Sequence, residues 1–87
     1  MTPESLREYL CSIWPLPWRV DPGAIDPAVV VADVGALGVA VTLTEPLLVV
    51  GVLGDEEFYE EETDDLPATL AELERTFREL VEVPGLA

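Results

Sequence analysis

The sequence predicts a small α+β domain: an N-terminal helix, a three- or four-stranded antiparallel meander sheet and a C-terminal helix, with both helices packed on one face of the sheet. Apolar residues recur at helical spacing near both ends of the chain. Val-rich segments separated by Gly and Pro turns lie between them, which is typical of short strands. The length of 87 residues fits one domain spanning residues 1–87.

The first helix is predicted from Pro3 to the residue before Pro15. Thr2 is a suitable N-cap, and Pro3 at the first helical position loses no hydrogen bond that the helix needs. The apolar residues of this segment form one stripe along the helix: Leu6, Tyr9, Leu10, Ile13 and Trp14.

The segment that follows is predicted to be extended and to contain turns. Pro15 and Pro17 favour a polyproline-like path between Trp14 and Trp18. We expect both indole rings to close one end of the core, because aromatic side chains supply large buried area. The alternative is a Pro-aromatic ligand for a groove on a partner. Turn signals then follow at residues 21–23 and 26–27.

The middle of the chain, residues 28–53, is predicted to form the meander. Residues 28–33 are Val-rich, residues 39–44 alternate between large apolar and small or hydroxylated side chains, and residues 47–53 are apolar on both faces. A short fourth strand, Glu57–Glu62, would turn Phe58 inward. If the helices cover one sheet face, Leu48, Val50 and Val52 or their alternates need another cover, which a second copy or a partner would supply.

The last helix carries the clearest periodic pattern. Thr63, Asp64 and Asp65 offer caps, although Thr69-x-x-Glu72 also fits a capping box and allows a later start. Pro84-Gly85 is expected to end the helix. The apolar stripe consists of Leu66, Leu70, Leu73, Phe77 and Leu80.

The composition excludes most kinds of catalytic site. The sequence has no His and no Lys, so the usual general base, the commonest neutral metal ligand and Schiff-base chemistry are absent. Cys11 is the single cysteine, which excludes an internal disulfide and a multi-cysteine zinc site. We therefore expect no enzymatic activity, no cofactor and no metal site.

Pairs of carboxylates and glycine-rich loops are the remaining candidates for a catalytic, metal-binding or phosphate-binding site. Asp33 and Glu45 are the acidic residues near predicted strand ends, but a chain this short leaves little room for a glycosidase cleft. Counting from Asp55, the positions that an EF-hand fills with an acid and a glycine hold Tyr59 and Glu60, so that motif fails. The phosphate-loop pattern GxxxxGK[ST] is absent as well.

The net charge narrows the range of partners. Eighteen Asp and Glu against four Arg give −14, which repels nucleic-acid phosphates and anionic membrane surfaces. The longest uncharged run of the apolar middle, Val34 to Thr44, is 11 residues, whereas a spanning helix needs about 20. The start of the chain lacks a secretory signal pattern, and one unpaired thiol suits a reducing compartment, so we expect a cytoplasmic location.

More than half of the net charge lies in residues 55–65, which contain eight acidic residues and no basic one. One interpretation is a solvated loop whose last acids stabilise the following helix. The other is a docking surface for a basic partner, in which Phe58 and Tyr59 provide apolar anchors inside a ring of charge. The candidate partner-binding residues are Asp55, Glu56, Glu57, Phe58, Tyr59, Glu60, Glu61 and Glu62.

The functional prediction is a small acidic protein–protein interaction module, acting as an adaptor, an inhibitor or a chaperone-like subunit that binds a basic protein surface. The order helix, three strands, helix in an acidic chain of this size resembles part of a type III secretion chaperone; this resemblance lies in the order of elements and involves no residue motif. The alternatives are a nucleic-acid mimic or immunity-type inhibitor, and a structural subunit of a larger assembly such as a phage particle. A homodimer is compatible with each.

Overall fold

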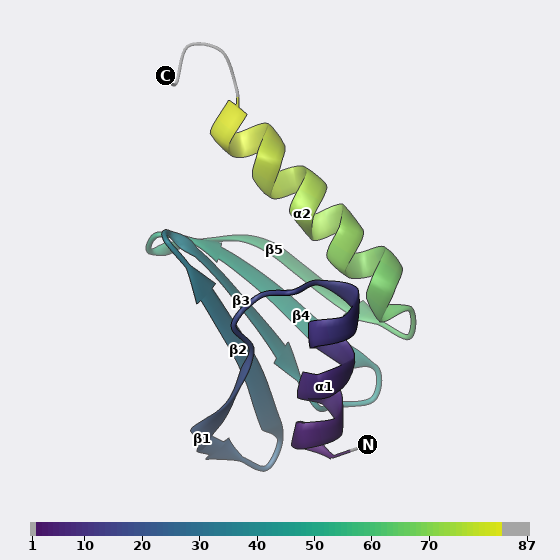
Figure 1. The fold of residues 1–87 in the computed structure, drawn as a ribbon. Coiled ribbons are helices and arrows are strands. Elements are labelled where there is room, and N and C mark those ends of the chain that lie inside the picture. Colours follow the sequence, from purple (N-terminus) through teal and green to yellow (C-terminus); the bar gives the residue numbers. More distant parts are fainter. Residues whose placement is uncertain (1, 83–87) are drawn as a thin grey trace.

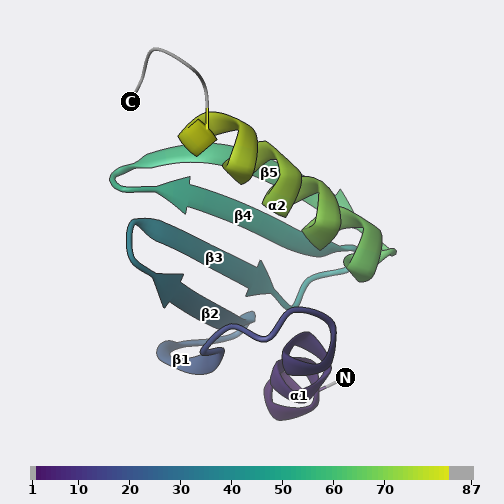
Figure 2. The same cartoon turned by 45° about the horizontal axis from the view of Figure 1, so that its top comes forward.

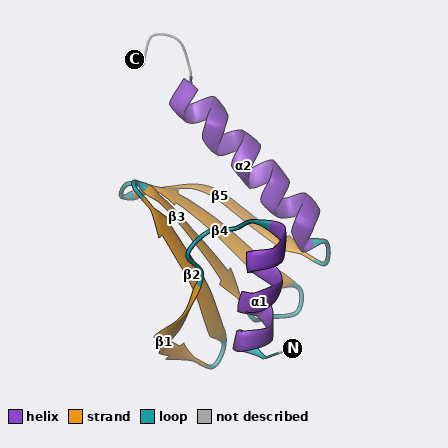
Figure 3. Cartoon of the chain, viewed as in Figure 1, coloured by secondary structure: helices purple, strands orange, loops and turns teal. Residues whose placement is uncertain are grey.

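The computed structural model describes residues 2–82 and confirms the predicted fold class (Figure 1). A five-stranded antiparallel sheet lies between an N-terminal and a C-terminal helix in chain order, as Figure 3 shows. The elements are α1 (Pro3–Ile13), β1 (Arg19–Ile25), β2 (Ala28–Val34), β3 (Leu37–Thr42), β4 (Leu47–Leu53), β5 (Glu56–Thr63) and α2 (Leu66–Glu82).

The sheet has one strand more than the sequence predicted. Its order is β1-β2-β3-β4-β5, so every strand pairs with its neighbour in sequence. The extra strand is β1, whose Pro22 and Gly23 had indicated only a turn. Its first residues pair with β2 (Arg19 with Val31, Val20 with Val30), and the register then shifts before Ile25 pairs with Ala28. Between these pairs the Gly23 backbone N–H donates to Asp21 Oδ1 at 2.9 Å, so the predicted turn at residues 21–23 is present as an irregularity within β1.

Two of the turns in the meander depend on glycine. Gly35 joins β2 to β3 with a φ of 60°, and Gly54 joins β4 to β5 with a φ of 65°. Positive φ at the first residue of a two-residue connection is typical of the hairpin turns that match strand twist, and glycine adopts it without steric cost. These turns pair β2 with β3 and β4 with β5 as antiparallel hairpins.

Helix α1 begins where the sequence predicted. The Thr2 hydroxyl accepts a hydrogen bond from the Ser5 backbone N–H, and the Ser5 hydroxyl accepts one from the backbone N–H of Thr2, which completes a capping box. Leu6 and Leu10 are fully buried. Beyond the helix, the indole N–H of Trp18 donates to the Trp14 carbonyl oxygen at 2.8 Å, and the two rings meet edge to face. Both rings belong to the core, as expected.

Helix α2 begins at Leu66, so the capping box at Thr69 is not its start. The Asp65 carboxylate accepts from the Ala68 backbone N–H at 3.3 Å. The Thr69 hydroxyl donates to the hydroxyl of buried Thr63 at 2.7 Å, which joins the helix to the end of β5. The predicted end at Pro84-Gly85 lies outside the described residues. Of the apolar stripe, the first half is buried: Leu66, Leu70 and Leu73.

Both helices pack on the same face of the sheet. Helix α1 contacts β1 and β2, whereas α2 contacts β4 and β5, and Figure 2 shows the two helices above the same side. The cross-strand row Ala32–Val39–Gly51 is buried beneath them. The core therefore lies between one layer of strands and one layer of helices, and the opposite face of the sheet carries neither described helix.

Candidate functional site

The acidic segment forms strand β5, at one edge of the sheet. Five of its eight residues are glutamates, all of them exposed: Glu56, Glu57, Glu60, Glu61 and Glu62. The prediction of a fourth strand at Glu57–Glu62 is confirmed, and the interpretation of this segment as a loop does not hold. Among residues 2–82, β5 pairs only with β4, so within this part of the chain its other side is a free strand edge.

A β-bulge decides which side chains of β5 face the helices. The register shifts between Gly51 and Val52, so that Gly51 pairs with Tyr59 and Val52 pairs with Glu57. Phe58 lies between these two pairs and faces the helices together with Tyr59. A regular strand would have placed them on opposite faces.

The two aromatic side chains of β5 pack against α2. The Phe58 ring lies 6.3 Å from the ring of Phe77, centroid to centroid. The Tyr59 hydroxyl donates to Glu72 Oε1 at 3.2 Å and is 3.5 Å from the carbonyl oxygen of Thr69. Both rings are half-buried against the core. The docking hypothesis assigned the apolar contact with a partner to these two rings. Because they pack against α2, other residues have to supply that contact.

The environment of Tyr59 changes its ionisation. Burial, then the neighbouring Glu72 carboxylate and its hydrogen bond, and finally Glu61 raise the pKa of Tyr59 to about 12 from the ordinary value of 10.0. Each of these influences disfavours a phenolate next to carboxylates. The hydrogen bond from β5 to α2 therefore requires the neutral form of the tyrosine.

The pKa of Tyr59 predicts how the stability of the fold depends on alkaline pH. Because the folded pKa is above the unfolded value, the contribution of Tyr59 is complete below pH 10 and is lost as the pH rises towards about 12. Spectrophotometric titration of the folded protein should show a tyrosinate component with a midpoint near 12. That component should be missing from Tyr59→Phe and present in Tyr9→Phe, whose side chain is 40% exposed. Its retention in Tyr59→Phe would contradict the assignment.

The glutamates of β5 divide between the two faces of the sheet. Glu57, Glu60 and Glu62 pair with Val52, Val50 and Leu48 and share their face, opposite the helices. Glu61 pairs with buried Val49, and Glu56 pairs with Leu53, on the helix side. The sequence could not predict this division, because it depends on the bulge at Phe58.

The carboxylates of β5 have no cationic partner within the described part of the chain. The ion pairs there join Arg19 to Asp33 at 3.0 Å and Arg78 to Glu74 at 3.6 Å. Neither pair involves β5. Strand β5 is therefore a strip of negative charge that residues 2–82 leave uncompensated.

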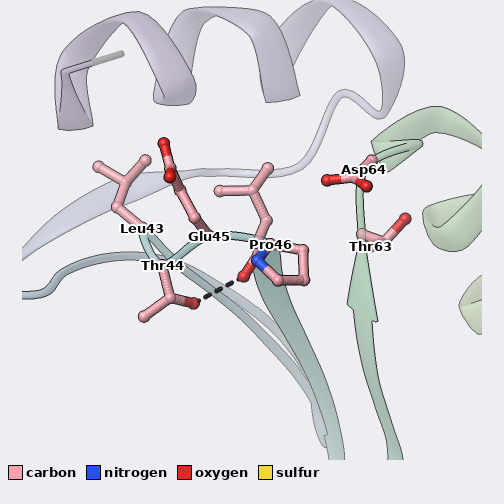
Figure 4. A pocket seen from close by; sticks show the side chains of 7 residues that line it. Leu43, Thr44, Glu45, Pro46, Thr63 and Asp64 are labelled. Carbon is pink, nitrogen blue, oxygen red and sulfur yellow. Dashed lines mark hydrogen bonds between the residues drawn. The ribbon is translucent and has the colours of Figure 1, made fainter.

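The residues considered for carboxylate chemistry do not come together. Asp33 lies near the end of β2, where it accepts from Arg19, and Glu45 lies in the connection at the other end of β3. Glu45 instead lines a cleft of about 440 Å³, with Asp64 on its opposite side (Figure 4). Thr44 Oγ1 donates to the Pro46 carbonyl oxygen at 2.9 Å in the wall of this cleft. The lining contains these two acids and no basic side chain.

Two further findings concern only residues 2–82. This part of the chain contains no cluster of three or more Asp, Glu, Cys or His residues able to hold a metal ion. Neither described helix is long and apolar enough to cross a membrane.

Compared with known proteins, the chain matches no protein-family model, no curated protein and no solved structure.

Proposed function

We propose that this protein is a small acidic interaction module of the cytoplasm, acting as an adaptor, an inhibitor or a chaperone-like subunit without catalysis. Its partner is a protein with a basic surface that docks on β5. The observation that carries the proposal is the exposed strip of five glutamates along an edge strand, which has no cationic partner among the described residues.

The charge of β5 acts mainly on the rate of encounter. An uncompensated negative strip attracts a positive surface over about 8 Å at physiological ionic strength, which raises the association rate. Affinity that persists at that salt concentration needs further contacts. The free backbone edge of β5 supplies hydrogen-bonding groups for such contacts.

The experiment begins with a tagged chain isolated from its native source at low and at physiological salt. A co-purifying basic protein is then produced on its own, and its association with the chain is measured by surface plasmon resonance. The test variant is Asp55→Asn/Glu56→Gln/Glu61→Gln, which removes three charges from exposed residues on or next to β5. The matched control is Glu4→Gln/Glu8→Gln/Glu79→Gln, which removes three exposed charges from the helices.

We expect the β5 variant to lower the association rate constant about tenfold at low salt, and the control to change it much less. The difference should shrink as salt is added, because screening already weakens the attraction in the unmodified protein. Equal rates for the two variants would refute docking on β5. Recovery of the tagged chain alone at both salt concentrations would refute the interaction module itself.

A further inference from the structure

The sheet face opposite the helices is aliphatic. Side chains on the helix side of β2, β3 and β4 are fully buried, as Val30, Val41 and Val49 show. The alternate residues of the same strands point to the other side, where neither described helix lies (Figures 1 and 2). They form what we call the open face, which also includes Gly38, Thr42 and the exposed Asp33. Its aliphatic side chains are each half-buried: Val29, Val31, Ala40, Leu48, Val50 and Val52.

The two edges of the open face carry opposite charge in one cross-strand row. Arg19 of β1 pairs with Val31, which pairs with Ala40, which pairs with Val50, which pairs with Glu60 of β5. Directly paired residues point to the same face of a sheet. An arginine therefore begins this row at one edge, and a glutamate ends it at the other. The exposed Arg19 guanidinium donates from Nη1 to Asp33 of its own chain at 3.0 Å, and this bond does not use its other N–H groups.

This arrangement is self-complementary for one of the two symmetric ways of stacking two copies face to face. A twofold axis parallel to the strands lays β1 of one copy over β5 of the other, so that Arg19 lies over Glu60 in both directions. An in-plane axis perpendicular to the strands lays β5 over β5 and opposes glutamates. Stacked sheets are about 10 Å apart, a gap that an arginine and a glutamate together span.

The area of the open face is sufficient for a specific contact. With strands about 4.8 Å apart and about six residues long at roughly 3.3 Å each, the face covers roughly 500 Å² per copy. Two copies would bury about 1,000 Å², which is about the minimum for a specific interface and typical of a weak dimer. Apart from its charged edges and Asp33, the face carries one side-chain polar group, the Thr42 hydroxyl, and its small, branched residues suit sheet-on-sheet packing.

We infer that a second copy of this chain covers the open face, with the twofold axis parallel to the strands and Arg19 of each copy paired with Glu60 of the other. The dimer would cover Glu57, Glu60 and Glu62, so a basic partner would dock on the free edge of β5 and on its helix-side glutamates. In such a sandwich Glu56 and Glu61 stay on the helix side of each sheet, so each copy keeps an outward acidic edge.

Sedimentation equilibrium at micromolar to millimolar concentrations tests this inference. The unmodified 9.5 kDa chain should show a dimer of about twice that mass. Arg19→Glu and Glu60→Arg should each raise the dimer dissociation constant at least about tenfold, and the double variant should restore it to within a few-fold. Glu8→Arg is the control for the charge change of Glu60→Arg, because Glu8 is exposed on α1.

A second variant tests the face without relying on its charges. Ala40→Glu places a carboxylate at the centre of the open face, where an isolated copy can leave it in water. We expect this variant to be a monomer with an unchanged far-ultraviolet circular dichroism spectrum. A strictly monomeric unmodified chain, a dimer unaffected by Ala40→Glu, or a double variant no tighter than either single variant would each overturn the inference. Asp55→Asn/Glu56→Gln/Glu61→Gln should leave the dimer intact, which separates the two proposals.

Discussion

Replacing Leu73 with alanine is expected to lower the free energy of unfolding by about 2–5 kcal/mol. Leu73 is fully buried in α2, and its side-chain atoms lie over Gly51 in the middle of β4. Removing three side-chain carbons at this point reduces the buried apolar area between α2 and β4 and leaves a cavity between helix and sheet. Gly51 has no side chain that could fill the space.

The expected loss is a large part of the total free energy of unfolding of a domain of this size. A chain of 87 residues has about 4–13 kcal/mol of stability at the usual value per residue. Each kcal/mol shifts the melting temperature by about 4–8 °C in a domain of this length. Urea denaturation and thermal melting of Leu73→Ala measure the effect. Leu80→Ala is the control, because Leu80 belongs to the same stripe but is 36% exposed; equal losses for the two variants would contradict the packing described.

Replacing Gly51 with valine is expected to cost about 3 kcal/mol through the opposite defect, overpacking. A Cβ atom at Gly51 would lie 3.0 Å from Phe58 Cζ and 3.1 Å from Leu73 Cδ1, closer than side chains normally approach. The valine methyl groups would add to this crowding. The absence of a side chain at Gly51 therefore lets α2 approach the sheet while the bulge holds Phe58 beneath the helix.

Two comparisons test the crowding at Gly51 by chemical denaturation. Gly38→Val is the control, because a Cβ there meets the carboxylate of Asp33, at the end of an exposed side chain, at 3.2 Å and Val52 Cβ at an ordinary contact distance of 3.9 Å. The double variant Gly51→Val/Leu73→Ala should lose clearly less free energy of unfolding than the two single variants lose in total, because the valine occupies space that the leucine vacated. Additive losses would show that the two residues do not share a contact.

Much of the fold could be predicted because its segments show a single periodicity. The 3.6-residue stripe of α2 and the alternation of β3 correspond to the faces that the structure buries. The two-sided apolar character of β4 indicated a central strand or one covered on both sides, and β4 does lie between β3 and β5. The exposure of the β5 glutamates followed from their charge.

Two features could not be predicted, since they depend on partners distant in the sequence. Strand β1 contains Pro22 and Gly23, which locally favour a turn, and it exists because Arg19 and Val20 pair with β2. The bulge at Phe58 turns Tyr59 towards Glu72 of α2, against the alternation that a regular strand would follow. Because of this bulge both aromatic side chains face the helices, whereas a regular strand would leave one of them on the opposite face.

The amino-acid sequence alone thus established the order of most elements, the acidic strip and the absence of histidine and lysine chemistry, because these follow from composition and short-range periodicity. Only the tertiary structure determines where the charged residues lie relative to one another. The pairing register sets Arg19 and Glu60 at opposite ends of one row and separates Glu56 and Glu61 from the open face. Register is a property of neighbouring strands, and a shift of one residue would reverse every side chain in it.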